Sequence, residues 1–180
     1  MSSTYTLSTS NLSPKELPHN IEAEQGLLGA ILLNNEVFYD VSEVINIDHF
    51  YEAVHKTIFE VIHKLISKGQ IATPITLKSY FEVEKTLEEI GGSSYLARLA
   101  NSAVSLDYAK SYAQIIYDLA VRRGLFELGG KVQHNAIESE MDVKPSDLIE
   151  EAEKDLYQIS EKGISTVSYT HLTLPTNREV

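Results

Sequence analysis

The string that comes closest to a phosphate-binding loop runs from Gly124 to Val132. Such a loop reads G-x-x-x-x-G-K-[ST]: its backbone amides cradle phosphates, its lysine neutralises them and its hydroxyl holds magnesium. Gly124 and Gly129 have the right spacing, but Gly130 stands at the lysine position, and Val132 rather than a hydroxyl residue follows Lys131. We therefore interpret the string as structural and predict no catalytic residue and no cofactor in this chain.

Three histidines and two glutamates are the other residues that could do chemistry. A metal site needs ligands that converge on one ion. His55 and His63 are eight residues apart on an expected helix, about two turns, and His49 brings no ligand motif with it. We predict no metal site and interpret His55 as a packing or hydrogen-bonding residue. Glu22 and Glu24 could act as paired carboxylates, but a position near the positive end of a helix dipole accounts for them.

Arg122 and Arg123 lie near the aromatic residues Tyr117 and Phe126, a combination that can contact nucleic acid. The charge balance favours another interpretation. The chain has 26 Asp and Glu against 15 Lys and Arg, a net charge of −11, whereas phosphate contacts usually need a basic face. We expect a salt bridge from this arginine pair to the acidic face of the last helix. That face consists of Glu150, Glu151, Glu153 and Asp155.

The composition indicates one folded domain in the cytoplasm. The chain has 180 residues, 43% of them hydrophobic, which is enough to bury a core. It has no run of about 18 apolar residues for a membrane span, and its polar first residues lack the apolar segment of a secretory signal. The absence of cysteine excludes disulfides and thiolate metal sites. We therefore expect a cytoplasmic protein without a membrane contact.

The elements that would position these residues are all helices. Apolar residues recur at three- and four-residue spacing, and no stretch alternates apolar and polar residues as a strand would. Asn20 is expected to cap the first helix and Gly69 to end the third, while interior glycines are expected to bend or fray the sixth. The expected helices are 20–33, 36–44, 51–68, 76–85, a short one carrying Tyr95 to Leu99, 106–137, and one from 142 or 146 to 162.

These all-α elements fall into two parts that follow a tail. Residues 1–17 are rich in Ser and Thr and are expected to be mobile; residues 18–103 are predicted to form a compact helical bundle, and residues 106–162 a helical hairpin. A lone hairpin has one apolar stripe per helix and cannot bury both, so it must pack on the bundle or on another copy of itself. The second option predicts self-association. The candidate residues for it are Tyr112, Ile116, Leu119, Arg122, Arg123, Leu148, Ile149, Ala152, Leu156 and Ile159.

The sequence leaves both options open for the stripe of Tyr112, Ile116 and Leu119, which can face either its own chain or a partner. Under the self-association hypothesis, Leu156→Asp, alone or with Ile116→Asp, should keep the bundle folded and lower the oligomeric state.

Residues 163–180 differ in residue pattern and charge from the rest of the chain. They have no helical period and no charge before Arg178. The string VSYTHLTLPT, from Val167 to Thr176, resembles one reading frame of a transposon-end adapter used in sequencing libraries. We interpret residues 163–180 as a non-native tail and expect the natural chain to continue beyond about residue 163. A genuine tail is the alternative.

Five blocks of sequence carry a family pattern. The first, LPHNIEAEQGLLGAILLNN at 17–35, fits the pattern P-x-N/S-x-E-A-E-x-x-L-L-G. The others are HFYEAVHKTIFEVI at 49–62, GGSSYLARLA at 91–100, DYAKSYAQIIYDLAVRRGL at 107–125 and LIEEAEKDLYQISE at 148–161. In this order and spacing they resemble the amino-terminal domain of bacterial replicative DNA helicases of the DnaB family.

The resemblance implies an all-α domain that precedes a RecA-like ATPase domain in a ring of six subunits. In the family these domains form a collar that pairs through its hairpins, where primase docks; helicase loaders also engage the ring. The motor domain binds ATP and magnesium and moves along single-stranded DNA. The resemblance thus implies a collar module for ring assembly and primase docking, in a parent protein that unwinds DNA. The alternative is a free-standing helical adaptor or regulator of the primosome, without a motor domain.

Overall fold

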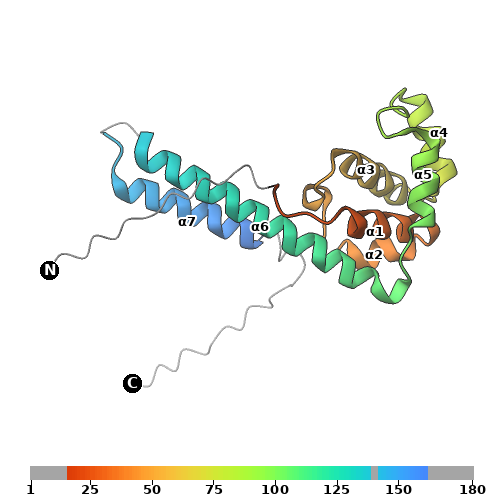
Figure 1. Cartoon of the computed structure of the whole chain (residues 1–180), viewed down its shortest axis with the longest axis horizontal. Helices are drawn as coiled ribbons and strands as arrows, with labels where there is room; N and C mark the ends of the chain where they lie inside the picture. The colour runs from red at the N-terminus through yellow and green to blue at the C-terminus, as the bar shows by residue number, and fades with distance from the viewer. Residues whose placement is uncertain (1–15, 139–141, 162–180) are drawn as a thin grey trace, which may run out of the picture.

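The computed structural model describes residues 16–138 and 142–161, and the tail at 163–180 lies outside them. Within the described ranges the chain forms seven α-helices, one 3₁₀ helix and no strand, so the predicted all-α class is confirmed. Figure 1 shows α1 to α5 gathered at one end of the molecule, with α6 running out of this bundle and α7 lying along its far half. The elements are α1 (Ile21–Leu33), α2 (Glu36–Val41), η1 (Ile47–His49), α3 (Ala53–Ser67), α4 (Pro74–Val83), α5 (Gly92–Asn101), α6 (Leu106–Glu138) and α7 (Pro145–Glu161).

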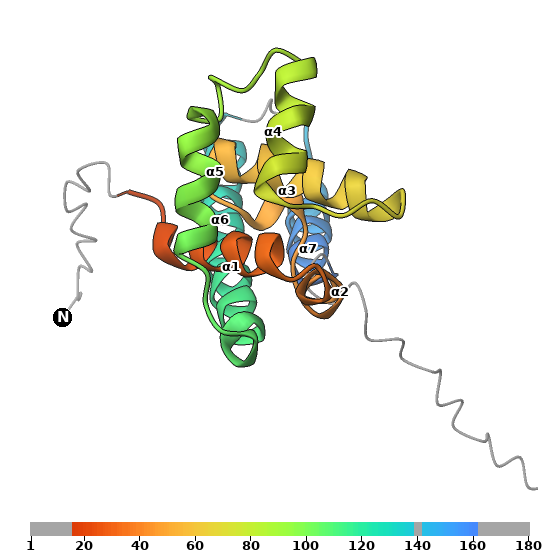
Figure 2. The ribbon, with the colours of Figure 1, turned by 90° about the vertical axis from the view of Figure 1, so that its right-hand side faces the viewer.

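Helix α1 is the centre of the bundle. The Asn20 side chain accepts a hydrogen bond from the Ala23 amide at 2.9 Å, so the predicted N-cap is confirmed. Leu27, Leu28 and Ile31 are fully buried, because α1 packs on α2, α3, α5 and α6 at once. Seen from the bundle end, α1 lies across α6 and beneath α5 (Figure 2). A helix buried on nearly every side needs neighbours all round, which explains its near-continuous apolar sequence.

Two other helix ends follow from their sequences. Gly69 ends α3 in the left-handed conformation, with a φ of 70°, as predicted. The fourth helix begins at Pro74, two residues before the predicted start, because the Thr73 side chain caps the Thr76 amide and proline is well suited to the first helical position.

Helix α6 is shared between the two parts of the molecule. It is one continuous helix of 33 residues, about 50 Å long, so the fraying predicted at its interior glycines is not seen. Its first half carries Ala109, Ala113 and Ile116, which are buried in the same core as α1. Its second half packs on α7 instead. The hydrophobic core therefore runs across the 103–106 boundary that the sequence suggested.

The close approach of α1 and α5 depends on Gly29. A Cβ atom on Gly29 would lie 2.0 Å from the Leu99 carbonyl oxygen and 2.9 Å from the Ala103 nitrogen, both of which are backbone atoms. We expect Gly29→Ala to lower the free energy of unfolding by roughly 1–3 kcal/mol, because the two helices must separate. Gly129→Ala is the matched control, since a Cβ atom on Gly129 would meet nothing within 4 Å.

The control should raise the free energy of unfolding by about 0.5–1 kcal/mol, since alanine costs less than glycine inside a helix. Urea titrations of the two variants give both values. Equal stability of Gly29→Ala and the parent chain would contradict the packing of α1 on α5.

Candidate partner-binding surface on the hairpin

Helix α7 buries none of its residues within the described chain. Ile149 is 60% exposed and Leu156 is 51% exposed, and Tyr157 is similarly open. The sequence of α7 is nevertheless amphipathic, with apolar residues at three- and four-residue spacing. An amphipathic helix draws most of its stability from burying that stripe, and among the described elements α7 packs chiefly on α6.

An apolar groove runs between α6 and α7. It has a volume of about 460 Å³. Its floor and walls come from Leu128, Val132 and Ala136 of α6 and from Leu148, Ile149 and Leu156 of α7. We call this groove, together with the exposed apolar residues of α7, the hairpin groove. Exposed apolar residues gathered on one face are typical of sites of protein association.

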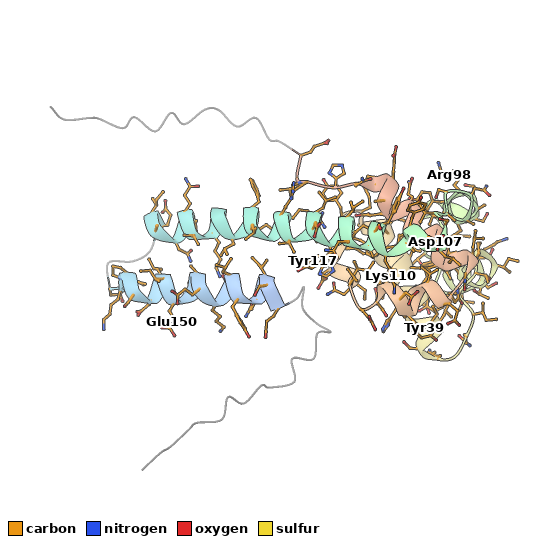
Figure 3. All side chains as sticks on the ribbon, turned by 90° about the horizontal axis from the view of Figure 1, so that it is seen from below. Tyr39, Arg98, Asp107, Lys110, Tyr117 and Glu150 are labelled. Atoms are coloured by element: carbon orange, nitrogen blue, oxygen red, sulfur yellow. The ribbon has the colours of Figure 1, made fainter. Side chains whose placement is uncertain are left out.

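Ion pairs fix α7 against α6 at the edge of the groove. The Lys131 Nζ atom lies 2.6 Å from Asp155 and 2.8 Å from Glu151. Hydrogen bonds to these two carboxylates raise the pKa of Lys131 above its ordinary value. The group is exposed, so the pairs contribute to register more than to stability. Glu150 points away from α6 in Figure 3, and the outer side of α7 is acidic.

Arg123 joins the hairpin to the bundle. Its guanidinium donates to the Pro18 carbonyl at 2.8 Å and to the His49 carbonyl at 2.7 Å, and it lies over the Tyr51 ring at 5.5 Å. Arg123 is buried, and burial lowers its pKa from the ordinary value. The predicted salt bridge from Arg123 to α7 was wrong, because backbone carbonyls of the bundle hold it. Lys131 makes the contact to the acidic residues of α7.

A buried chain of polar groups lies behind Arg123. The Glu24 carboxylate accepts from the Tyr51 amide at 2.6 Å and pairs with His55 Nδ1, while His55 Nε2 and the Tyr95 hydroxyl are hydrogen-bonded at 2.6 Å. His55 has no exposed surface, so no substrate can reach this carboxylate–imidazole pair. The expectation that His55 is a hydrogen-bonding residue is confirmed. The pairing with Glu24 was missed, since residues 31 apart carry no local signal.

The predicted self-association residues occupy three different environments. Ile116 is 2% exposed, and together with Arg123 it belongs to the interior of its own chain. Tyr112, which contacts the α1 region near Gly26, and Leu119 are half-buried, and Arg122 is exposed. On α7, Ile149 and Leu156 are exposed and the other three are half-buried. Those three are Leu148, Ala152 and Ile159.

Two kinds of site are absent from the described residues. No group of three or more His, Cys, Asp or Glu side chains is placed to hold a metal ion in the part of the chain that the structure covers. No helix among residues 16–138 and 142–161 is long and apolar enough to cross a membrane.

The fold is an all-α bundle followed by a helical hairpin with an open groove. The family model for the DnaB-like helicase N terminal domain matches residues 16–118, and the chain belongs to this family. It is 44% identical over 161 residues to the replicative DNA helicase DnaB of Rickettsia prowazekii, which covers 89% of this chain and 33% of that protein. The DnaB of Geobacillus stearothermophilus is 31% identical over 147 residues, covering 81% of this chain and 32% of that protein. The chain thus spans about a third of the length of these relatives.

Two solved structures share the fold. The N-terminal domain of DnaB helicase from Mycobacterium tuberculosis superposes with a TM-score of 0.73 at 27% identity, covering 78% of this chain and 98% of that one. A DnaB-like replicative helicase, studied with its interactions with primase, gives a TM-score of 0.64 at 28% identity. That alignment covers 80% of this chain and 32% of the helicase.

The role of Arg123 can be tested against its neighbour. Arg123→Met should lower the free energy of unfolding by about 1–3 kcal/mol, because the Pro18 and His49 carbonyls lose their donor in a buried place. Arg122→Met changes an exposed side chain and should stay within about 0.5 kcal/mol of the parent. Thermal and urea unfolding measure both. An equal loss of unfolding free energy in the two variants would contradict the role of Arg123 in holding α6 to the bundle.

Proposed function

We propose that this chain is the collar module of a replicative DNA helicase and that its hairpin groove is a self-association surface. The observation that carries the proposal is α7, which has an apolar stripe and no buried residue in the described chain. A second copy with the same groove would complete the stripe by an isologous contact, in which each copy covers the other. Burial of apolar area drives such a contact, and the charged groove edges set its register.

The proposal extends to a ring of up to six copies and to primase as the docked partner. Membership of the family supports the ring. The related helicase structure, studied with its interactions with primase, supports the docking of primase. Docking would hold primase at the replication fork at a high effective concentration. A titration of labelled primase with this chain checks this, and an absence of saturable binding would contradict it. A helicase loader is a further proposed partner of the ring.

The parent protein is proposed to be an ATP-dependent DNA helicase. The curated relatives are about three times as long as this chain, and they are named replicative DNA helicases. ATP, magnesium and single-stranded DNA would bind the remaining part of such a protein, since the described residues carry no phosphate-binding loop. Reading the gene beyond the codon for Val180 tests this, and a frame that ends there would favour the motorless adaptor instead.

Leu156→Asp tests self-association directly. A carboxylate in the groove costs apolar burial and places like charges together, so the molar mass in light scattering should fall toward that of one chain. Val83→Asp is the matched control, because Val83 is 80% exposed on α4, away from the hairpin. It should leave the molar mass unchanged.

Ile116→Asp is not a suitable second variant, contrary to the expectation from the sequence, because Ile116 is buried against its own bundle. A charge there would unfold the chain rather than separate two copies. An unchanged molar mass for Leu156→Asp, with the fold intact by circular dichroism, would overturn the self-association proposal.

A further inference from the structure

A second apolar face lies on α6, separate from the hairpin groove. Tyr108 is 63% exposed on it and Phe126 is 65% exposed, while Ile115 is exposed and Leu119 half-buried between them. We call these four residues, together with Arg122, the outer stripe. Steps of seven residues relate Tyr108 to Ile115 and Ile115 to Arg122, and also Leu119 to Phe126. The groove residues of α6, such as Val132, lie about a third of a turn round the helix from this stripe.

The spacing of the outer stripe is that of a coiled-coil seam. Alternating steps of three and four residues run from Tyr108 through half-buried Tyr112, Ile115, Leu119 and Arg122 to Phe126. A seam with this repeat accepts the side chains of one facing helix over its whole length, as knobs into holes. From Tyr108 to Phe126 the seam is about 27 Å long, enough for a partner helix of five turns.

Arg122 is the one cation in the seam, and it has no ion-pair partner among the described residues. Asp118, one turn before it on α6, accepts a hydrogen bond from Gln114 at 2.8 Å. A helix docked along the seam would partly desolvate Arg122, and a carboxylate on that helix would offset this cost. The charge therefore selects the kind of helix that fits.

A second copy of this chain does not supply that carboxylate. Two parallel copies would place Arg122 against Arg122. Two antiparallel copies, with Tyr108 facing Phe126, would place Arg122 against Tyr112. Single-stranded DNA fits poorly as well, because helical spacing places Asp107 and Asp118 beside the stripe, where carboxylates repel phosphates.

We propose that the outer stripe of α6 docks an amphipathic helix of another protein, in coiled-coil packing, with a carboxylate of that helix facing Arg122. This surface is independent of the hairpin groove, so a copy paired through its groove can still bind the helix. The proposal adds a binding site of defined chemistry to the collar module, namely an apolar seam with one acidic position.

The test uses the full chain and two synthetic helical peptides of roughly three heptads. Both have a leucine and isoleucine seam with a single charged seam position, which is glutamate in one peptide and lysine in the other. Fluorescence anisotropy should show that the glutamate peptide binds at least about tenfold more tightly than the lysine peptide. Arg122→Glu should reverse this preference, and Phe126→Asp should abolish binding of both.

Three results would overturn the proposal. The first is the absence of binding, or binding with no preference between the two peptides. The second is loss of peptide binding in Leu156→Asp with retention in Phe126→Asp, which would place the peptide in the groove. The third is evidence for another occupant. A fall in molar mass for Ile115→Asp would assign the stripe to a second copy, and binding of a dT20 oligonucleotide that Arg122→Glu removes would assign it to DNA. Because Leu156→Asp tests only the groove, failure of self-association and failure of this proposal can be told apart.

Discussion

Among the described elements, the apolar stripe of α7 packs chiefly on α6, and two helices packed side by side share only one face. Lys131 holds the register of the two helices through Glu151 and Asp155, but these exposed ion pairs add little stability. The remaining apolar surface of α7 stays open along the hairpin groove. The proposed self-association follows from the need to bury that surface, on a hairpin that stands away from the bundle in Figure 1.

The hairpin is held in a fixed direction because α6 belongs to both parts of the molecule. Its first half is built into the core around α1, and Arg123 then fastens the helix to the carbonyls of Pro18 and His49. The segment that receives Arg123 is itself held from behind, since the Glu24 carboxylate accepts from the backbone of Tyr51 and Glu52. Buried polar groups thus run from α1 through residues 49–52 to α6. A groove on a rigidly mounted helix can be presented in a constant position to other copies.

Much of the fold could be predicted from the sequence, because local rules set it. Asn20 and Gly69 mark helix ends by their own chemistry, and the apolar spacing gives the helices. One long helix at 106–137 was predicted, but the fraying expected at Gly124, Gly129 and Gly130 is not seen, because packing on α7 and the length of the helix outweigh a local cost of roughly 1 kcal/mol for each glycine. The burial of Arg123 and Ile116 within the bundle could not be predicted from the sequence either. Side chains one or two turns apart on the same helix face the bundle, the groove or solvent, and only tertiary packing decides which. The Glu24–His55 pair was not predicted for the same reason, since it depends on two helices meeting.

Hydrogen exchange at two protein concentrations measures most directly whether a second copy covers α7. If the groove is a self-association surface, the α7 amides and those of α6 around Val132 should exchange more slowly at the higher concentration, because pairing protects them. The amides of α1 and α3 should be unaffected. The contrary result is that the α7 amides exchange equally fast at both concentrations although the molar mass changes between them. That result would contradict the account and place the contact between copies elsewhere.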